Sequence, residues 1–194
     1  MPNSDELLVI RCQEGDKSAF ELLFKKYQRR IYHLIYRITQ DPGAVEPLAQ
    51  EVFLKAYRAI HSFRRNSQFY TWLYRIAVNT SLSYVKRDTP EESREQHPLD
   101  IGTLSAQEGV TAATAGTPEQ EVMRKEFYEH VLDAVRQLPE ELRVAIVLRE
   151  FVGLNYEEIA EVIQIPLGTV RSRIFRGRAR LRESLASYVQ LEQQ

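Results

Sequence analysis

The sequence is short of the residues on which catalytic sites, metal sites and disulfide bonds usually depend. Its single cysteine, Cys12, has no second cysteine with which to form a disulfide within the chain. The four histidines are scattered, no cysteine–histidine cluster has the spacing of metal ligands, and no glycine-rich phosphate-binding loop occurs. We therefore expect no catalytic residue, no metal, no cofactor and no small-molecule ligand.

Long apolar runs are missing as well. No stretch is apolar over the roughly 20 residues that a membrane-spanning helix requires. The first residues do not show the basic and then apolar pattern of a signal peptide. An unpaired cysteine also suits a reducing compartment. The sequence therefore predicts a cytoplasmic protein without direct membrane insertion.

The strict alternation that marks a half-buried strand is absent too, whereas apolar residues recur at helical spacing over most of the chain. The predicted fold class is all-α. Asp16 is placed to cap the second helix, and the segment 41–43 breaks the chain before the third, which is expected to turn Leu48, Val52 and Tyr57 inward. The helices expected in the first half of the chain cover residues 1–14, 17–39, 45–60 and 69–87.

Helical periodicity stops at Asp88 and returns sharply at Thr117, which is placed as a helix cap before Pro118 and Gln120. The stretch between is dominated by Thr, Ala, Gly, Ser and Glu, a composition typical of a linker. The chain is thus predicted to consist of two small helical domains, residues 1–88 and 118–194, joined by a flexible acidic linker, residues 89–117.

Basic residues are concentrated near the two ends of the chain. Residues 1–88 hold fourteen Lys or Arg against nine Asp or Glu, and residues 166–194 hold six against two. Residues 89–165 reverse the balance, with six basic and sixteen acidic residues. Two basic regions separated by an acidic stretch indicate two contact points on a polyanion.

The end of the chain fits a helix-turn-helix, preceded by helices over 118–138 and 140–153. Asn155 caps a short helix, with Glu158 placed to reach back to the cap, and a turn at 165–168 leads to a final helix that starts at Thr169. The residues assigned to this motif are Tyr156, Glu157, Ile159, Ala160, Gly168, Thr169 and Val170.

The final helix is predicted to read duplex DNA. An apolar stripe is formed at 100° per residue by Val170, Ile174, Gly177 and Leu181. The opposite face is rich in arginine, which can pair with guanine or bind phosphate, and its phenylalanine can contact a thymine methyl group. The residues expected to contact DNA there are Arg171, Ser172, Phe175 and Arg176.

The helix over 69–87 and the loop before it have a different chemistry. A hydrophobic core explains the apolar arc of Phe69, Trp72, Leu73, Ile76, Ala77 and Tyr84, while a separate polar arc holds Thr71, Arg75, Asn79 and Lys86. Basic groups beside aromatic rings and an amide suit the binding of a single strand and the reading of an unstacked base. The residues assigned to this site are Arg64, Arg65, Asn66, Ser67, Arg75 and Asn79.

Three strings carry a family resemblance, with support from 138–140 and 156–160. The strings are Gln50–Tyr57, Phe69–Thr80 and Gly168–Arg176. Over nearly its full length the chain resembles the extracytoplasmic-function (ECF) group of bacterial sigma factors, especially the envelope-stress members. The resemblance implies a factor that binds core RNA polymerase, directs it to specific promoters and promotes promoter melting in a stress response. It also implies an anti-sigma factor as a partner.

The resemblance implies a separate task for each domain. The first resembles the sigma-2 domain, which binds core polymerase, here through Gln50 and Glu51, and the melted −10 element of promoter DNA. The second resembles the sigma-4 domain, which binds the −35 element and the polymerase flap. The linker would then pass near the RNA exit path.

Two positions depart from the family pattern. Pro47 stands where the family commonly has Asp, which puts one polymerase contact in doubt, and Pro47 is a candidate first residue of a helix capped near Glu46. The loop after Phe63 reads Arg-Arg-Asn-Ser at 64–67, where envelope-stress members commonly have Arg-Gly-Asp-Ser. This loop is more basic and less flexible, so the base that it selects is expected to differ.

Two other interpretations fit parts of the sequence less well. A helix-turn-helix regulator that acts without polymerase, as a dimer, explains the second half of the chain but not the helix over 69–87 or the exposed Gln50 and Glu51. An enzyme is disfavoured by the scattered histidines and the lack of a metal or phosphate motif.

Overall fold

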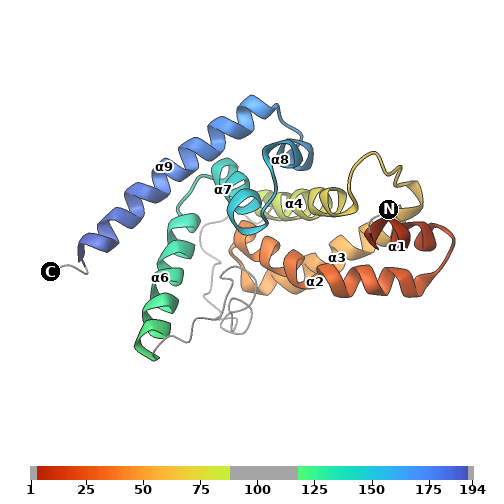
Figure 1. The fold of residues 1–194 in the computed structure, drawn as a ribbon, viewed down its shortest axis with the longest axis horizontal. Coiled ribbons are helices and arrows are strands. Elements are labelled where there is room, and N and C mark those ends of the chain that lie inside the picture. The colour runs from red at the N-terminus through yellow and green to blue at the C-terminus, as the bar shows by residue number, and fades with distance from the viewer. Residues whose placement is uncertain (1–3, 88–117, 192–194) are drawn as a thin grey trace. The chain divides into compact units, whose positions relative to one another are not determined.

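A computed structural model describes the backbone of residues 4–87 and 118–191, and the side chains of residues 4–87 and 126–186. Within these ranges the chain is helical and no strand occurs, which confirms the all-α prediction. None of the helices in the described ranges is long and apolar enough to cross a membrane. The elements are α1 (Ser4–Gln13), α2 (Lys17–Thr39), α3 (Pro42–Ala59), the 3-10 turn η1 (Ile60–Ser62), α4 (Phe69–Arg87), α6 (Pro118–Arg136), α7 (Glu140–Ile146), the π-helical turn η2 (Val147–Phe151), α8 (Tyr156–Ile163) and α9 (Leu167–Leu191) (Figure 1).

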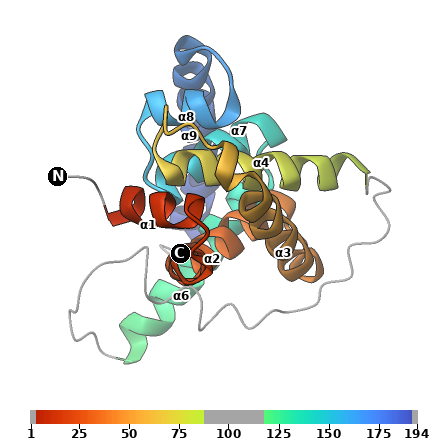
Figure 2. The same ribbon diagram turned by 90° about the vertical axis from the view of Figure 1, so that its right-hand side faces the viewer.

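The described residues divide into two compact units. In the first unit, α2 packs against α1, α3 and α4, and α3 also packs against α4 (Figures 1 and 2). The fully buried large side chains of this unit are Val9, Leu23, Ile31, Leu34, Ile35, Ile38, Ile60 and Leu73. Five of these eight lie on α2 at helical spacing, so α2 is the central helix of the unit.

Asp16 caps α2 as predicted. Its Oδ1 accepts hydrogen bonds from the backbone N–H groups of Ser18, at 2.9 Å, and Ala19, at 3.3 Å. Hydrogen bonds from the Ser18 hydroxyl and from the Arg11 guanidinium lower the pKa of Asp16 to about 2. Because Arg11 belongs to α1, the cap also ties the end of α1 to the start of α2.

The start of α1 is held by a buried acid that the sequence did not single out. Asp5 is only 4% exposed, and it accepts hydrogen bonds from Tyr27 Oη and Lys26 Nζ, each at 2.5 Å. Burial of Tyr27, together with its hydrogen bond to Asp5, raises the pKa of the phenol, so Tyr27 remains a donor. α1 is therefore fixed on α2 at both of its ends.

α3 begins earlier than predicted, because segment 41–43 starts the helix. Asp41 Oδ1 accepts from the backbone N–H of Gly43 at 2.9 Å, and Pro42 takes the first helical position, where its missing N–H costs nothing. Pro47 lies inside α3, so the prediction that it is the first residue of a helix is wrong. Tyr84 Oη donates to Asp41 Oδ2 at 2.5 Å, which links α4 to this cap.

The inward face of α3 was predicted correctly except at one residue. Leu48 and Val52 are buried, but Tyr57 is 42% exposed and meets Phe20 edge-on at a ring distance of 5.0 Å. The inward position of that turn is taken by Ala56, which is fully buried. Ala56 follows Val52 by four residues, so it lies on the same buried face of α3. Tyr57, one residue later, lies about 100° further round the helix.

In the second unit, α9 packs against both α6 and α7. The segment predicted as one helix over 140–153 is α7 followed by η2. Gly177 is where α9 meets α7, because a Cβ there would lie 2.6 Å from Ile146 Cγ1. The buried residues of this unit include Leu142, Val144, Ile146, Leu148, Val170 and Ile174.

The turn before α9 differs from the prediction by two residues. The capping box is confirmed, since Asn155 N donates to Glu158 Oε2 at 2.7 Å and Glu158 N donates to Asn155 Oδ1 at 2.8 Å. α9, however, begins at Leu167 rather than at Thr169. The chain reverses at Gln164, which has a left-handed φ of 53°, so the turn falls earlier.

The predicted linker, residues 89–117, lies outside the described residues, as does the predicted cap Thr117. Pro118 is the first residue of α6, where it was expected.

Candidate nucleic-acid interfaces

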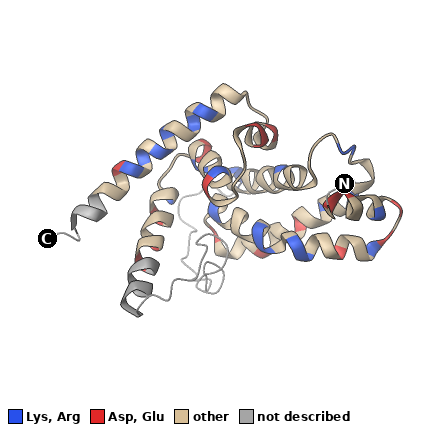
Figure 3. Cartoon of the chain, viewed as in Figure 1, with Lys and Arg blue, Asp and Glu red and all other residues tan. Residues whose placement is uncertain are grey.

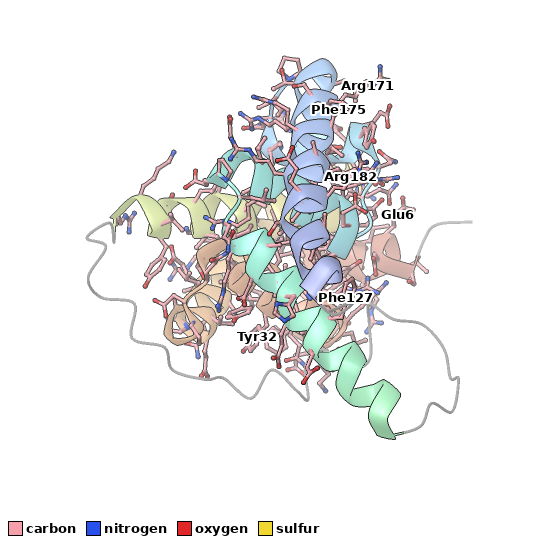
Figure 4. The ribbon with its side chains drawn as sticks, turned by 90° about the vertical axis from the view of Figure 1, so that its left-hand side faces the viewer. Glu6, Tyr32, Phe127, Arg171, Phe175 and Arg182 are labelled. Atoms are coloured by element: carbon pink, nitrogen blue, oxygen red, sulfur yellow. The ribbon has the colours of Figure 1, made fainter. Side chains whose placement is uncertain are left out.

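α9 presents the predicted DNA-contacting residues on its exposed face. Val170 and Ile174 of the apolar stripe are buried, and Phe175 opposite them is 76% exposed. Figure 4 shows Phe175 projecting from α9 between Arg171 and Arg182. This position leaves the phenylalanine ring accessible to a thymine methyl group, as the sequence predicts. All four predicted residues are exposed, namely Arg171, Ser172, Phe175 and Arg176.

Basic residues recur along α9 (Figure 3), and its arginines fall into two groups by their ion pairs. Arg173 Nη2 lies 3.0 Å from Glu141 Oε2, and Arg178 Nη2 lies 2.7 Å from Glu150 Oε1. The hydrogen bond to Glu150 raises the pKa of Arg178. These two arginines therefore hold α9 on its own unit. The others are exposed and make no ion pair within the described residues, and they are Arg171, Arg176, Arg180 and Arg182.

The start of α8 is oriented by an arginine that was not singled out from the sequence. Arg149 Nη1 donates to the carbonyl oxygen of Leu154 at 2.8 Å, and its guanidinium lies 5.2 Å from the centre of the Tyr156 ring. A cation over an aromatic face fixes the ring, so Arg149 couples η2 to the helix-turn-helix. Of the residues assigned to the motif, Ile159 and Val170 are buried, Tyr156, Ala160 and Thr169 are half-buried, and Glu157 and Gly168 are exposed.

The loop between η1 and α4, residues 63–68, is anchored by an aromatic cluster. Phe63 is buried, with its ring centre 4.9 Å from that of Trp72 and 6.2 Å from that of Phe69. Trp72 is thus part of the core, as predicted. Beyond Phe63 the side chains turn outward: Ser67 is half-buried, and Arg64, Arg65, Asn66 and Gln68 are exposed.

Arg65 has a left-handed backbone, with a φ of 56°. This conformation costs roughly 1–2 kcal/mol for a residue with a Cβ and nothing for glycine. It explains in physical terms why glycine suits this position in the family pattern. The substitution by arginine adds a charge at the tip of the 63–68 loop and makes its backbone conformation more costly.

A second anchor of this loop comes from α1. Gln13 Nε2 donates to the carbonyl oxygens of Ile60 and Phe63, each at 2.9 Å. A glutamine at the end of an amphipathic helix has no distinguishing pattern, so only the folded structure reveals its role.

α4 carries the amide and cationic groups behind the 63–68 loop. Asn79 and Lys86 are exposed and Arg75 is half-buried, as their polar arc requires. Thr71 is 1% exposed, so its assignment to that arc is wrong. α4 packs against both α2 and α3 and therefore buries a wider arc than a single stripe. The structure brings Phe63 of the loop onto Trp72 of α4, while Asn79 lies two turns further along the helix.

The exposed face of α3 combines polar and apolar groups. Gln50 and Glu51 are exposed, as predicted, beside Leu54 and Tyr57, which are 47% and 42% exposed. Glu51 Oε1 lies 2.6 Å from Lys55 Nζ, which also donates to Thr80 Oγ1 of α4 at 3.1 Å. Large apolar side chains left in water beside polar ones are typical of a protein-binding face.

No group of three or more metal-ligating side chains occurs within the described residues. Cys12 is buried, and this burial raises the pKa of its thiol above the ordinary value, so the sulfur is a poor nucleophile at neutral pH. Cys12 therefore serves as a small apolar side chain in the core of the first unit.

Comparison with known proteins identifies two family regions. Sigma-70 region 2 matches residues 23–90, and Sigma-70, region 4 matches residues 128–181. The RNA polymerase sigma-H factor of Pseudomonas aeruginosa is 47% identical over 184 residues, which are 93% of this chain and 93% of that protein. The ECF RNA polymerase sigma-E factors of Haemophilus influenzae and Escherichia coli are 45% and 44% identical, covering 90% of this chain and 92% and 91% of theirs.

Two solved structures share the fold. CnrH in complex with the cytosolic domain of CnrY has a TM-score of 0.69 and 22% identity, covering 95% of this chain and 99% of that one. The sigma factor RpoE in complex with the anti-sigma factor NepR from Bartonella quintana has a TM-score of 0.62 and 22% identity, covering 86% and 96%.

Proposed function

This chain belongs to the ECF family of RNA polymerase sigma factors, and we propose that it binds core RNA polymerase, directs it to promoters and promotes their melting. The observation that carries the proposal is that one chain exposes two different sets of basic, polar and aromatic side chains, one on α9 and one on the 63–68 loop with α4. α9 suits duplex DNA, and the 63–68 loop with α4 suits an unpaired strand. A factor that must recognise a promoter and then open it needs both.

The proposed task of α9 is to read the −35 element in the major groove. Among the side chains that the structure describes, only Arg173 and Arg178 of this helix form ion pairs, so we infer that its exposed arginines are available to DNA. Arg176 is placed to pair with a base, and Phe175 to contact a thymine methyl group. Arg180 and Arg182, nearer the end of α9, are placed to bind phosphates.

The proposed task of the 63–68 loop and α4 is to capture an unpaired base of the −10 element. The amide of Asn79 offers a donor and an acceptor to a Watson–Crick edge once that edge is free. Arg64 and Arg65 at the loop, with Arg75 on α4, supply positive charge for the adjoining phosphates. Asn66 and Ser67 complete the set with small polar groups.

The proposed polymerase-binding face is the exposed face of α3. Gln50 and Glu51 provide polar contacts, and the exposed Leu54 and Tyr57 provide apolar area to bury. Pro47 is exposed on the same helix. Because Pro47 is accommodated inside α3 without ending it, the departure removes a side-chain carboxylate without altering the position of Gln50 and Glu51 on the helix.

The remaining expectations follow from the same proposal. We place the domain boundaries at 1–88, 89–117 and 118–194, and the protein in the cytoplasm as a non-enzyme that acts in a stress response. RpoE of Bartonella quintana was solved in complex with an anti-sigma factor, and this supports an anti-sigma factor as the regulator of this chain. The acidic linker and the acidic segment 120–165 would repel phosphate, so the free protein should bind promoter DNA poorly.

Run-off transcription tests the proposal. Purified core polymerase is incubated with a library of duplex promoters, with and without this protein, and the transcripts are sequenced. We expect transcripts from a shared pair of −35 and −10 sequences only when the protein is present. A regulator acting alone would instead elute as a dimer in gel filtration, bind one duplex sequence tightly at physiological salt and produce no new transcripts.

A further inference from the structure

α1 lies outside the residues that match the family regions, which begin at 23, yet it touches the part of the first unit proposed to capture DNA. It packs against η1 as well as against α2. At the start of α1, Asp5 accepts hydrogen bonds from Lys26 and Tyr27 of α2. At its end, Arg11 donates to Asp16, the residue that caps α2. A helix held this firmly can serve as a support for a neighbouring loop.

The support acts through one side chain. Gln13 is half-buried and its Nε2 carries two hydrogens, which are directed at the carbonyl oxygens of Ile60 and Phe63, each at 2.9 Å. These two carbonyls bracket η1, and the second belongs to the first residue of the 63–68 loop. Gln13 therefore joins the end of α1 to the point where that loop begins.

The backbone of the 63–68 loop depends on this hydrogen bond, because few of the side chains that follow Phe63 are packed in the core. After Phe63 its side chains are exposed or half-buried, and Arg65 adopts the unfavourable left-handed conformation only two residues beyond the Gln13 contact. The aromatic contacts of Phe63 with Trp72 and Phe69, and the hydrogen bond from its N–H to the Ile60 carbonyl, do not involve the Phe63 carbonyl, whose direction depends on the rotation of the next peptide. A hydrogen bond to the Phe63 carbonyl limits that rotation.

We propose that Gln13 is a positioning residue for base capture, because it orients the Phe63 peptide and so holds Arg65 and Asn66 where an unpaired −10 base is read. This inference rests on the proposed function of the 63–68 loop. Gln13 touches no DNA in this proposal. Its contribution is to sequence discrimination, not to the affinity for polymerase.

Three substitutions of Gln13 distinguish the effect of its hydrogen-bond donors from the effects of side-chain size and charge. Gln13→Glu keeps the shape but turns a carboxylate toward two carbonyl oxygens, and Gln13→Leu keeps most of the volume without a donor. Gln13→Lys restores donors with a similar reach. Glu14→Leu is the matched control, because Glu14 is the exposed neighbour on the same turn and makes no contact with the loop among the described residues.

The measurement uses holoenzyme, formed from core polymerase and the full chain, with single-stranded DNA randomised across the −10 element. Bound strands are sequenced, and the ratio of the preferred to the next base is taken at each position. Loss of two hydrogen bonds predicts a fall of about tenfold in this ratio at one or two positions for Gln13→Glu and Gln13→Leu, and recovery in Gln13→Lys. Glu14→Leu should keep the wild-type ratio.

A purely structural effect would lower the amount of active holoenzyme and leave the ratio unchanged, so an unchanged ratio in Gln13→Glu overturns the inference. A ratio that falls in Gln13→Glu but does not recover in Gln13→Lys also overturns it. If wild-type holoenzyme shows no base preference at all, the proposed function of the loop fails instead, and the two failures are therefore distinguishable.

Discussion

The two surfaces that are proposed to read DNA are built in opposite ways. α9 is a continuous helix whose exposed residues follow directly from its buried stripe of Val170 and Ile174. The second surface combines the irregular 63–68 loop, the exposed arc of α4 and the supporting contact from Gln13 of α1. The first surface is one face of one helix, and the second is formed by three separate segments of the chain.

This difference predicts how the two surfaces respond to change. Exposed residues of α9 touch little of their own unit, so substitution there should alter DNA contacts without altering the helix. The loop surface is held by residues that lie behind it, such as the buried Phe63 and the half-buried Gln13, so we expect substitutions at these residues to change its specificity. The predictions that follow test this contrast, from the largest expected effect to the smallest.

Gly177→Leu should have the largest effect, because it separates α9 from α7. A Cβ at this position would lie 2.6 Å from Ile146 Cγ1, and overpacking of this kind costs about 3 kcal/mol. We expect a lower melting temperature by far-ultraviolet circular dichroism. Trp72 is the only tryptophan and lies in the first unit, so its fluorescence transition should not move.

The matched control for this prediction is Gly168→Ala. A Cβ at Gly168 would meet nothing within 4 Å, and alanine favours the helix by up to about 1 kcal/mol. The second unit should therefore be unchanged or slightly more stable. A Gly177→Leu variant that melts like the wild type would show that α9 does not depend on this close approach.

Asn79→Ala should reduce open-complex formation on duplex promoters by roughly tenfold, because a base-reading amide is worth about 1–3 kcal/mol. Association with core polymerase should be unaffected, since Asn79 is exposed and lies on α4 and not on the proposed polymerase face of α3. Potassium permanganate footprinting of melted thymines, with Ser83→Ala as an exposed control on the same helix, measures the effect.

On a template already mismatched at −10, the Asn79→Ala defect should shrink only in part. Melting is then supplied by the template, but reading of the base is still lost. Complete recovery would assign Asn79 to melting instead of recognition, and equal activity of variant and wild type on both templates would remove Asn79 from the site.

Arg176→Ala should change the sequence preference for DNA and Arg178→Ala should change stability, although both remove an arginine from α9. Arg176 has no ion pair within the described residues, so its loss should relax sequence preference at one or two positions of the −35 element, by about 1–3 kcal/mol. Arg178 is committed to Glu150, so its loss should leave the preference unchanged and cost no more than about 1 kcal/mol of stability.

Binding selection on randomised −35 duplexes, repeated at two salt concentrations, separates these outcomes. If Arg176→Ala weakens binding to every sequence equally and flattens the salt dependence, Arg176 is a phosphate contact and the assignment to a base is wrong.

Arg65→Gly should have the smallest effect on stability, and in the favourable direction. Glycine removes the cost of the left-handed backbone but gains entropy in the unfolded chain, so the net stabilisation of the first unit should not exceed about 1 kcal/mol. Urea unfolding followed by Trp72 fluorescence measures it. The loss of one positive charge should also lower the salt dependence of single-strand binding, and a destabilised first unit would contradict the strain argument.

Much of this molecule was readable from the sequence because it depends on local rules. The cap by Asp16 and the capping box of Asn155 and Glu158 each concern residues within three positions of one another, and both were predicted. One error occurred where two local rules compete. Pro47 looked like a helix start, but Asp41 and Pro42 had already formed one five residues earlier, with Tyr84 of α4 supporting the cap.

The candidate sites also contain features that follow from local rules and features that depend on tertiary packing. Helical periodicity by itself determined the exposed face of α9, the exposure of Gln50 and Glu51 and the outward position of Asn79, because 3.6 residues per turn sets which side chains share a face. It misplaced Thr71, because the width of the buried arc of α4 depends on how many helices pack against it.

What the tertiary structure alone decided concerns residues that are distant in sequence. Only the packing of α1 against α2 and η1 places Gln13 on the carbonyls of Ile60 and Phe63, 47 and 50 residues away. Only the folding of the second unit brings Glu150 of η2 onto Arg178 and leaves Arg176 without an ion pair within the described residues. Hydrogen bonds and ion pairs act over a few ångströms, so they depend on which helices become neighbours, and no local pattern of the sequence records that.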